Sequence, residues 1–169
     1  MPDKQLLILN QHQIQQKIDR IAYQILEDNF DEKEILIAGI LPRGNKIAER
    51  LKVLLDEIAP FSSTLINIEI EKQSNSLQTI VDFDVQDCSN KVVILVDDVL
   101  NSGKTLAYGF GVFLDVPLKK LRTAVLIDRN HKRYPMTTDY AGVALSTVLK
   151  EHVDVVLDEA GEEDAVYLR

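Results

Sequence analysis

Apolar residues along the chain follow helical spacing in three stretches. Between Asn10 and Asn29 they lie three and four positions apart, which places them on one face of a helix. Asn10 and Gln13 are typical of a capping box at the start of that helix. The same spacing returns at 45–58, and a stretch from about Thr105 to Val116 is compatible with a third helix.

Short runs of apolar and β-branched residues lie between these helices and predict strands. Residues 35–40 (ILIAGI), 91–97 (KVVILVD) and 121–127 (LRTAVLI) have the continuous apolar character of strands buried on both faces. TLINIEI at 64–70 alternates instead, so this strand is expected to have one wetter face. VDVVLD (153–158) and, more weakly, AVYLR at 165–169 are two further candidates.

The alternation of strands and helices predicts an α/β fold. We expect a doubly wound, mostly parallel sheet with helices on both faces and right-handed crossovers. A chain of 169 residues can bury a sizeable core, and it contains no linker rich in Pro, Gly or Ser and no internal repeat. One domain spanning 1–169 is therefore expected.

Composition and charge narrow the possible partners. Hydrophobic residues make up 46% and charged residues 27%, a mix typical of a globular protein. Nineteen Lys and Arg against 27 Asp and Glu give a net charge of −8. This acidity disfavours general binding of nucleic acid, which depends on basic surface, although it leaves room for a local basic patch. The single cysteine, Cys88, cannot form an internal disulfide, and no long apolar run begins the chain, so a cytoplasmic protein without a membrane span is expected.

Three segments that follow buried strands carry the candidate chemistry. In an open α/β sheet, ligands bind outside the carboxyl ends of the strands. The segments at those ends are LPRGNK (41–46), DDVLNSGKT (97–105) and DRNHKRYP (128–135).

The middle segment has the features of an anion cradle with acids beside it. Asp97 and Asp98 close an apolar strand, and 101–105 (NSGKT) lead into a helix. Hydroxyl groups, a glycine and the amides of a helix start can together hold a phosphate. The acids are suited to sugar hydroxyls or to a cation nearby. A nucleotide-hydrolase P-loop is excluded, because it requires glycine at the position of Asp98.

A plain surface turn would account for NSGKT, but not for the paired acids. Charges that close a buried strand are costly unless a ligand, a cation or solvent compensates them. VVILVDDVLNSGKTL resembles the phosphoribosyl pyrophosphate (PRPP) signature of the type I phosphoribosyltransferases. AGILPRGNKIAERL, AVLIDRNHKRYPMTTDYAG and VVLDE narrow the resemblance to the branch that attenuates pyrimidine operons and also has uracil phosphoribosyltransferase activity.

The resemblance assigns roles residue by residue. It implies that Asp97 and Asp98 hold the ribose hydroxyls, and Mg²⁺ indirectly through PRPP. The 5′-phosphate would be held by Asn101, Ser102, Gly103, Lys104 and Thr105, and the pyrophosphate by Leu41, Pro42, Arg43 and Gly44. Arg43 alone could be a solvated charge, but a guanidinium between Pro42 and Gly44 also suits a diphosphate. With Asp97 and Asp98, Arg43 is expected to be catalytic.

The third segment is expected to lie on the base side. Asp128 and Arg129 follow a strand end, and Arg129 could contact pyrophosphate or a cation-bound water. Tyr140 could pack beside the base or belong to the core.

Two stretches depart from the family pattern. The lid that family members carry before the strand at 91 is shortened here and contains no arginine. LSTVLKEH (145–152) replaces a proline-containing turn near the base, so the identity of the base stays open.

These observations lead to one hypothesis and two rivals. The first is a Mg²⁺-dependent phosphoribosyltransferase that converts PRPP and a nucleobase, with uracil preferred, and that forms a homo-oligomer. The second is a regulator that senses PRPP or nucleotides with weak or no turnover, with or without RNA binding, which the net charge disfavours. The third is an α/β domain with neither activity.

Overall fold

A computed structural model describes residues 5–73, 76–147 and 151–169, with the side chains of 72–77 excepted. The helices are α1 (Gln11–Asn29), α2 (Gly44–Ile58), the short 3₁₀ helix η1 (Val85–Cys88) and α3 (Lys104–Gly111). The strands are β1 (Leu6–Leu9), β2 (Glu34–Ile40), β3 (Ser62–Gln73), β4 (Ser76–Val81), β5 (Val92–Leu100), β6 (Lys120–Asp128), β7 (Tyr140–Ala144), β8 (Val153–Val156) and β9 (Ala165–Leu168).

The main sheet has the strand order β4-β3-β2-β5-β6-β7. Five neighbouring strands of this sheet pair in parallel, in the order β3-β2-β5-β6-β7. The edge strand β4 runs antiparallel to β3. The expected doubly wound, mostly parallel sheet is therefore confirmed.

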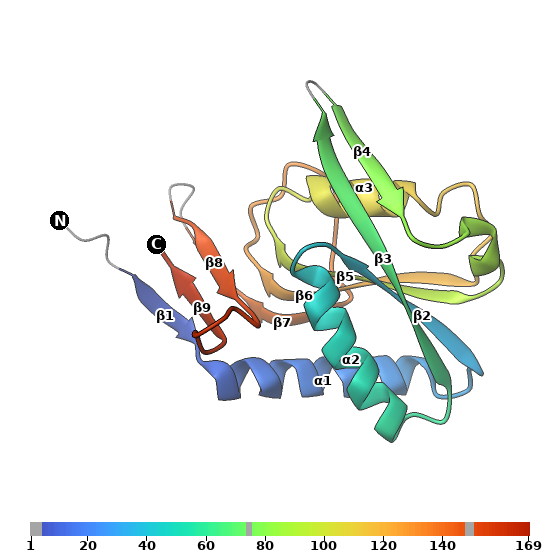
Figure 1. Ribbon diagram of the computed structural model, residues 1–169, viewed down its shortest axis with the longest axis horizontal. Helices are drawn as coiled ribbons and strands as arrows, with labels where there is room; N and C mark the ends of the chain where they lie inside the picture. The colour runs from blue at the N-terminus through green and yellow to red at the C-terminus, as the bar shows by residue number, and fades with distance from the viewer. Residues whose placement is uncertain (1–4, 74–75, 148–150) are drawn as a thin grey trace.

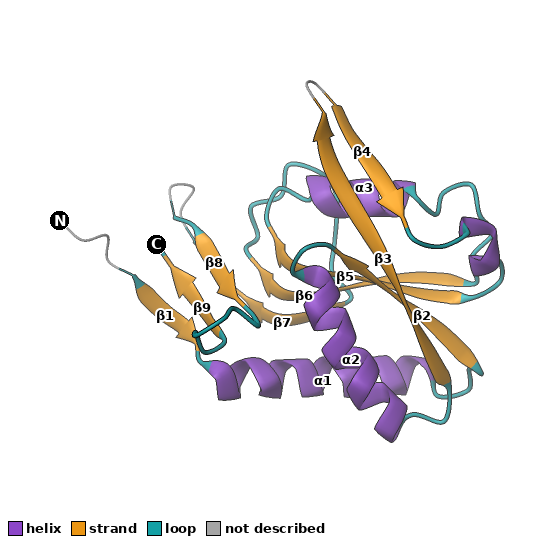
Figure 2. Cartoon of the chain, viewed as in Figure 1, coloured by secondary structure: helices purple, strands orange, loops and turns teal. Residues whose placement is uncertain are grey.

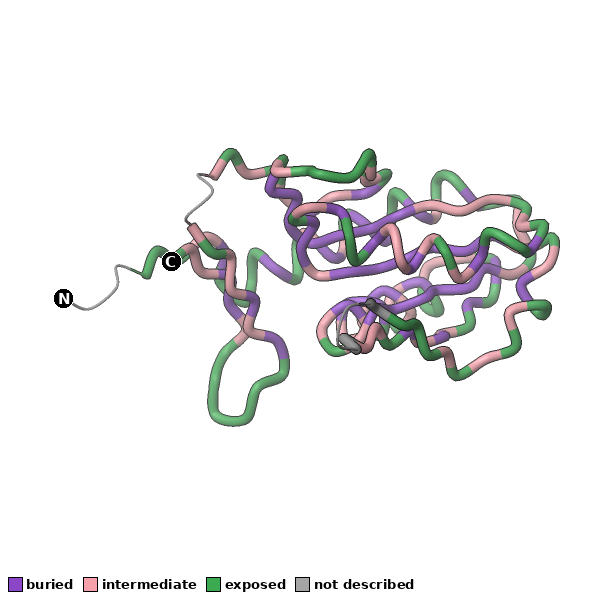
Figure 3. The backbone as a smooth tube through the Cα atoms, turned by 90° about the horizontal axis from the view of Figure 1, so that it is seen from above, coloured by how far each residue is buried: buried purple, intermediate pink, exposed green. Residues whose placement is uncertain are grey.

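Helices cover both faces of this sheet (Figure 1). One face packs against α1, which lies over β6 and β7, and α2, which lies over β2, β3 and β5. The other face packs against α3 and the segment around η1. The central strands are buried almost throughout, as the tube coloured by burial shows (Figure 3). Their continuous apolar sequences reflect this two-sided burial.

The predicted start of α1 is confirmed. Gln13 donates its backbone N–H to Asn10 Oδ1 at 2.8 Å, and the Asn10 backbone N–H returns a bond to Gln13 Oε1 at 2.9 Å. This pair is a complete capping box.

The C-terminal strands β8 and β9 form a second, smaller sheet together with β1. Here β9 lies between β1 and β8, and both neighbours run antiparallel to it (Figure 2). The apolar runs at 153–158 and 165–169 predicted these two strands, whereas β1 was not predicted. Four residues carry little periodicity, and the partner of β1 lies at the far end of the sequence.

The stretch between β3 and β5 contains an antiparallel hairpin. β3 continues to Gln73, beyond the predicted end at 70, because β4 pairs with it from Ile68 onward. Figure 1 shows this hairpin extending away from the main sheet on the side of α3. This hairpin occupies the stretch in which the resemblance expects a shortened lid.

Two other boundaries differ from the sequence predictions. β5 continues past Asp97 and Asp98 to Leu100, because its pairing with β6 persists to the end of both strands. α3 ends at Gly111 instead of reaching Val116, since Gly109 and Gly111 are poor helix formers. The following turns are tighter, with bonds such as Phe113 N–H to the Phe110 carbonyl.

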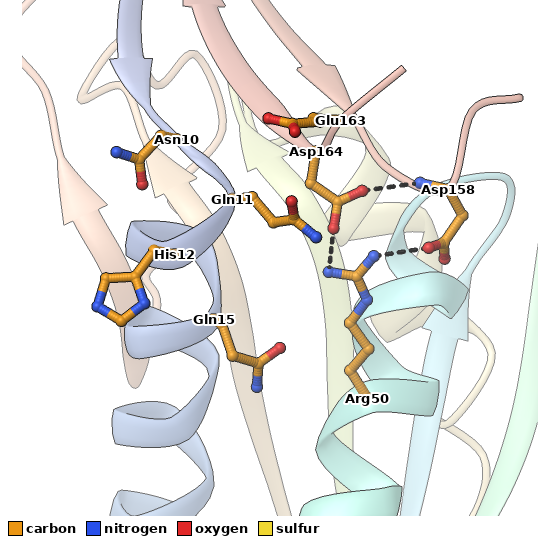
Figure 4. A pocket seen from close by; sticks show the side chains of 8 residues that line it. All are labelled: Asn10, Gln11, His12, Gln15, Arg50, Asp158, Glu163 and Asp164. Carbon is orange, nitrogen blue, oxygen red and sulfur yellow. Dashed lines mark hydrogen bonds and ion pairs between the residues drawn. The ribbon is translucent and has the colours of Figure 1, made fainter. Parts of the chain in front are cut away.

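Arg50 ties the small sheet to α2. Its guanidinium lies 2.8 Å from Asp158 and 2.7 Å from Asp164, in the loop between β8 and β9 (Figure 4). Burial raises the pKa of Asp164, but bonds from Arg50 and from the Asp158 backbone N–H lower it by more, so its pKa lies below the usual value. A carboxylate with a lowered pKa stabilises the folded state above its unfolded pKa of about 4.

We therefore expect Asp164→Asn to lower the free energy of unfolding at pH 7 by roughly 1–2 kcal/mol. The difference from the wild type should begin to shrink as pH falls below about 4 and should be lost once pH passes below the lowered folded-state pKa of Asp164, where the carboxyl group is protonated in both states. Urea unfolding at pH 7 and pH 3 measures both values. Glu162→Gln, at an exposed position in the same loop, is the control. A loss that is equal at both pH values would contradict the ionic role of Asp164.

Candidate active site

The main sheet has a topological switch point between β2 and β5. From β2 the chain crosses to β3 on one side, and from β5 it crosses to β6 on the other. At such a point the two connections separate and leave a crevice outside the carboxyl ends of the strands. Residues 41–44 and 97–105 flank this crevice, so the two strongest candidate segments of the sequence are brought together.

Gly44 seats the first of these segments against the end of β5. A Cβ atom at this position would lie 2.5 Å from the Val96 carbonyl oxygen and 2.9 Å from the Asp97 Cα. Only glycine allows so close an approach between the two backbones. The Leu41–Pro42 peptide bond just before it is cis. Glycine here therefore sets the position of Arg43.

Arg43 faces the acid pair. Its Nη1 atom lies 3.7 Å from Asp98 Oδ2, and its side chain is 41% exposed, against 17% for Asp98. An ion pair of this length and exposure contributes little free energy. Arg43 can therefore turn to an anionic ligand at little cost while staying beside the acids.

Asp97 and Asp98 lie inside β5 and are shielded to different degrees. Asp97 is buried, and its carboxylate accepts the Asp98 backbone N–H at 2.9 Å. Burial above all, and then the neighbouring Asp98 carboxylate, raise the pKa of Asp97 well above its usual range, while Arg43 opposes this only in part. An ionised Asp97 is thus costly without a ligand, and a positive charge beside it would relieve that cost.

The segment after β5 forms a loop at the start of α3. Gly103 has φ +89°, a left-handed conformation that favours glycine, and it directly precedes the helix. The backbone N–H of Lys104 donates to Ser102 Oγ at 3.3 Å. This bond occupies the first N–H of the helix, whereas Gly103 at the N-cap position has no side chain to accept the next ones. The helix start therefore keeps backbone donors for an anion.

A small cavity of about 30 Å³ lies at this loop. Its lining includes Asp97 and all five residues expected to hold the 5′-phosphate, from Asn101 to Thr105. The loop that the resemblance assigns to the 5′-phosphate therefore surrounds a hollow next to Asp97.

The third segment folds against this loop. The backbone N–H groups of Arg133 and Tyr134 both donate to the Ser102 carbonyl, at 2.8 and 3.0 Å. Asp128, which is buried at the end of β6, accepts the Asn130 backbone N–H at 2.9 Å and the Thr138 hydroxyl at 3.3 Å. The Asp128 carboxylate thus organises its own loop at the edge of the site.

Arg129 is buried beside Asp128 and bonds to protein groups on two sides. Its guanidinium reaches Asn101 of the loop after β5 and the chain that follows β7, at Thr147 and Glu151. The sequence did not indicate Thr147 or Glu151, because β7 itself was not predicted. Residues 148–150, within the stretch that departs from the family pattern, lie outside the described residues.

Tyr140 does not belong to this group, contrary to its expected place beside the base. It begins β7, where it pairs with Ala124, whereas Asp128 pairs with Ala144. Four strand residues correspond to roughly 13 Å. The Tyr140 hydroxyl donates to Asp28 of α1, and burial followed by this bond raises the pKa of Tyr140. Tyr140 is a core residue, the second of its two expected places.

A much larger cavity lies elsewhere. It has a volume of about 830 Å³ and is bounded by the start of α1, by Arg50 and by the loop between β8 and β9 (Figure 4). None of the three candidate segments lines it. No helix in the described part of the chain is long and apolar enough to cross a membrane.

The sequence matches known proteins over nearly its whole length. Residues 5–160 match the family model described as phosphoribosyl transferase domain. The Bifunctional protein PyrR of Fusobacterium nucleatum is 33% identical over 99% of this chain and 100% of the relative. That of Alkaliphilus metalliredigens is 35% identical over 98% of this chain and 95% of the relative.

Solved structures with the same fold include hypoxanthine and hypoxanthine-guanine phosphoribosyltransferases. An enzyme from Trypanosoma cruzi superposes with a TM-score of 0.78 at 17% identity, covering 97% of this chain and 91% of the other. A hypoxanthine-guanine phosphoribosyltransferase from Bacillus anthracis gives 0.71 at 25% identity, with 82% and 81% covered. Because the family model matches residues 5–160 and the two relatives are 33% and 35% identical over nearly their whole length, the chain belongs to the phosphoribosyltransferase family.

Proposed function

We propose that this protein transfers the phosphoribosyl group of PRPP to a nucleobase and releases pyrophosphate. The observation that carries this proposal is the meeting of three groups at the switch point: Arg43, the Asp97 and Asp98 pair, and the loop from Asn101 to Thr105. They offer, respectively, a cation for a diphosphate, carboxylates for ribose hydroxyls, and backbone amides for a 5′-phosphate.

The two ends of PRPP fix its direction across the crevice. Arg43 lies on the β2 side, so the pyrophosphate belongs there, and the base must attack from the β6 side. A bond forms between a base nitrogen and ribose C1 while the bond from C1 to the pyrophosphate oxygen breaks. The bonding electron pair leaves with pyrophosphate, and the base nitrogen releases its proton. Positive charge that develops on the ribose ring would be stabilised by the carboxylates beside it.

The acid pair also fits the proposed Mg²⁺. This ion is usually held by one or two carboxylates together with substrate phosphates. Among the described residues there is no cluster of three or more His, Cys, Asp or Glu side chains suited to a metal. Asp97 and Asp98 would therefore hold the ion through PRPP, and the ion would neutralise the departing diphosphate.

Uracil is the base we favour. The support is the resemblance to the branch that has uracil phosphoribosyltransferase activity, together with relatives named Bifunctional protein PyrR. The solved structures of the same fold act on hypoxanthine or guanine by name, which makes these bases the natural competitors.

The decisive experiment is an assay of purified protein with PRPP, Mg²⁺ and a panel of uracil, hypoxanthine, guanine and xanthine. We expect UMP and pyrophosphate in equal amounts from uracil, and no product when Mg²⁺ is chelated. Product from a purine alone would overturn the uracil assignment, and no product from any base would overturn the transferase proposal.

The relatives' name, which implies two functions, supports a regulatory alternative. A regulator would bind PRPP or UMP tightly in calorimetry without forming product. RNA binding by such a regulator is disfavoured by the net charge of −8. A gel-shift assay with leader RNA at physiological salt tests it.

Asp98→Asn should lower kcat/KM for PRPP at least about 100-fold, because one carboxylate aimed at the ribose and its cation is lost. Steady-state kinetics measures the effect. Asp115→Asn, an exposed aspartate after α3, should leave the kinetics unchanged. If Asp98→Asn matched the wild type, Asp98 would have no place in the site.

Asp97→Asn should have opposite effects on stability and on ligand binding. The raised pKa of Asp97 means that its ionisation costs stability above its unfolded pKa of about 4. The variant should melt roughly 2–4 °C higher at pH 7, lose that advantage near pH 3, and bind PRPP more weakly. Thermal unfolding at both pH values and PRPP calorimetry test this. A lower melting temperature at pH 7 would contradict it.

A further inference from the structure

Arg129 is a buried cation at the edge of the crevice. It directly follows β6, and 6% of its surface is exposed. Among the described residues, no other lysine or arginine is buried to this degree. Burying a guanidinium is costly unless its N–H groups are satisfied. The protein groups that satisfy them therefore indicate what Arg129 does.

Within the described parts of the chain, the guanidinium bonds to acceptors from two segments through all three of its nitrogen atoms. Nη1 donates to Asn101 Oδ1 at 3.0 Å, in the loop expected to hold the 5′-phosphate. Nε donates to Thr147 Oγ1 at 3.1 Å, and Nη2 donates to the Glu151 carbonyl at 2.6 Å, both beyond β7. A rigid planar fork fixes the relative positions of the groups it joins.

The strand order places Thr147 and Glu151 on the side from which the base approaches. Arg43 follows β2, while the chain after β7 lies beyond β6 on the other side of β5. Leu145 is held at this edge, since its backbone N–H donates to the Asp128 carbonyl at 2.7 Å. If pyrophosphate leaves on the side of Arg43, the base must enter on the side of Thr147.

We propose that Arg129 is a positioning residue that locks the base side of the site to the 5′-phosphate loop. This inference rests on the proposed function. Arg129 acts through Asn101, Thr147 and Glu151, so that the base and the phosphate of one nucleotide are bound in register. Bonding to Asn101 Oδ1 also turns the amide nitrogen of Asn101 away from Arg129, where it can donate to a ligand.

The test compares two ligands by calorimetry. Ribose 5-phosphate occupies only the phosphate half of the site, whereas UMP occupies both halves. Thr147→Val removes one acceptor and keeps the shape of the side chain. We expect it to raise the Kd of UMP about 3- to 10-fold and that of ribose 5-phosphate less than 2-fold. Thr64→Val, at an exposed position on β3, is the matched control and should change neither.

Arg129→Lys keeps the charge but loses the fork. It should raise the Kd of UMP at least as much as Thr147→Val does. In steady-state turnover it should raise KM for the base more than KM for PRPP. Equal weakening of both ligands, or no weakening of UMP in either variant, would overturn the proposal. If Arg129→Lys fails to fold, the result with Thr147→Val decides.

A readout without ligand separates this inference from the proposed function. Hydrogen exchange followed by NMR reports the bond from the Leu145 amide to Asp128. In Arg129→Lys this amide should exchange about 10-fold faster, while amides in the centre of β5 stay protected. That result supports the positioning role even if no base is converted. Unchanged Leu145 exchange in a folded variant would overturn it, whatever the assay shows.

Discussion

The parallel pairing of β2 with β5 is the constraint on which the candidate site depends. Ile35 to Gly39 run alongside Val92 to Val96, so both strands end at the same edge of the sheet. The chains that leave them then diverge, and Gly44 lets the first one rest on the carbonyl of Val96. Without that contact, Arg43 would have no fixed relation to Asp98. Backbone packing therefore assembles the site before any ligand is present.

Placing the acid pair at this position has an electrostatic cost. Asp97 is removed from water and placed next to another carboxylate, and the cation that opposes this, Arg43, is loosely held. Proteins commonly concentrate such strain at sites that bind charged partners. The two features are complementary. Buried Asp97 is stabilised by a positive charge beside it, whereas the remaining backbone N–H groups at the start of α3 are stabilised by a negative charge. A ligand that carries both a cation and a phosphate satisfies the two together.

The sequence was informative where local pattern decides structure. The core strands, the cap of α1 and the glycine loop before α3 all follow from spacing and turn chemistry. Long-range pairing decided the rest. YAGVA carries little strand signal, so β7 was not predicted. The sequence predicted Tyr140 beside the base, but one sequence does not reveal the register of β6 with β7. In that register Tyr140 pairs with Ala124, roughly four residues before Asp128 at the site edge of β6. The bonds of Arg129 were hidden for the same reason.

The small sheet has a consequence for how the chain folds during synthesis. β1 is made first, yet its pairing partner β9 is made much later, since Leu6 pairs with Leu168. Until then β1 has no strand to pair with, and Arg50 lacks both of its carboxylate partners. The main sheet can form on the ribosome, strand by strand from β2 to β7. Closure of the small sheet must wait until β9 has been made, so the slow step of folding is expected to be this final, non-local pairing.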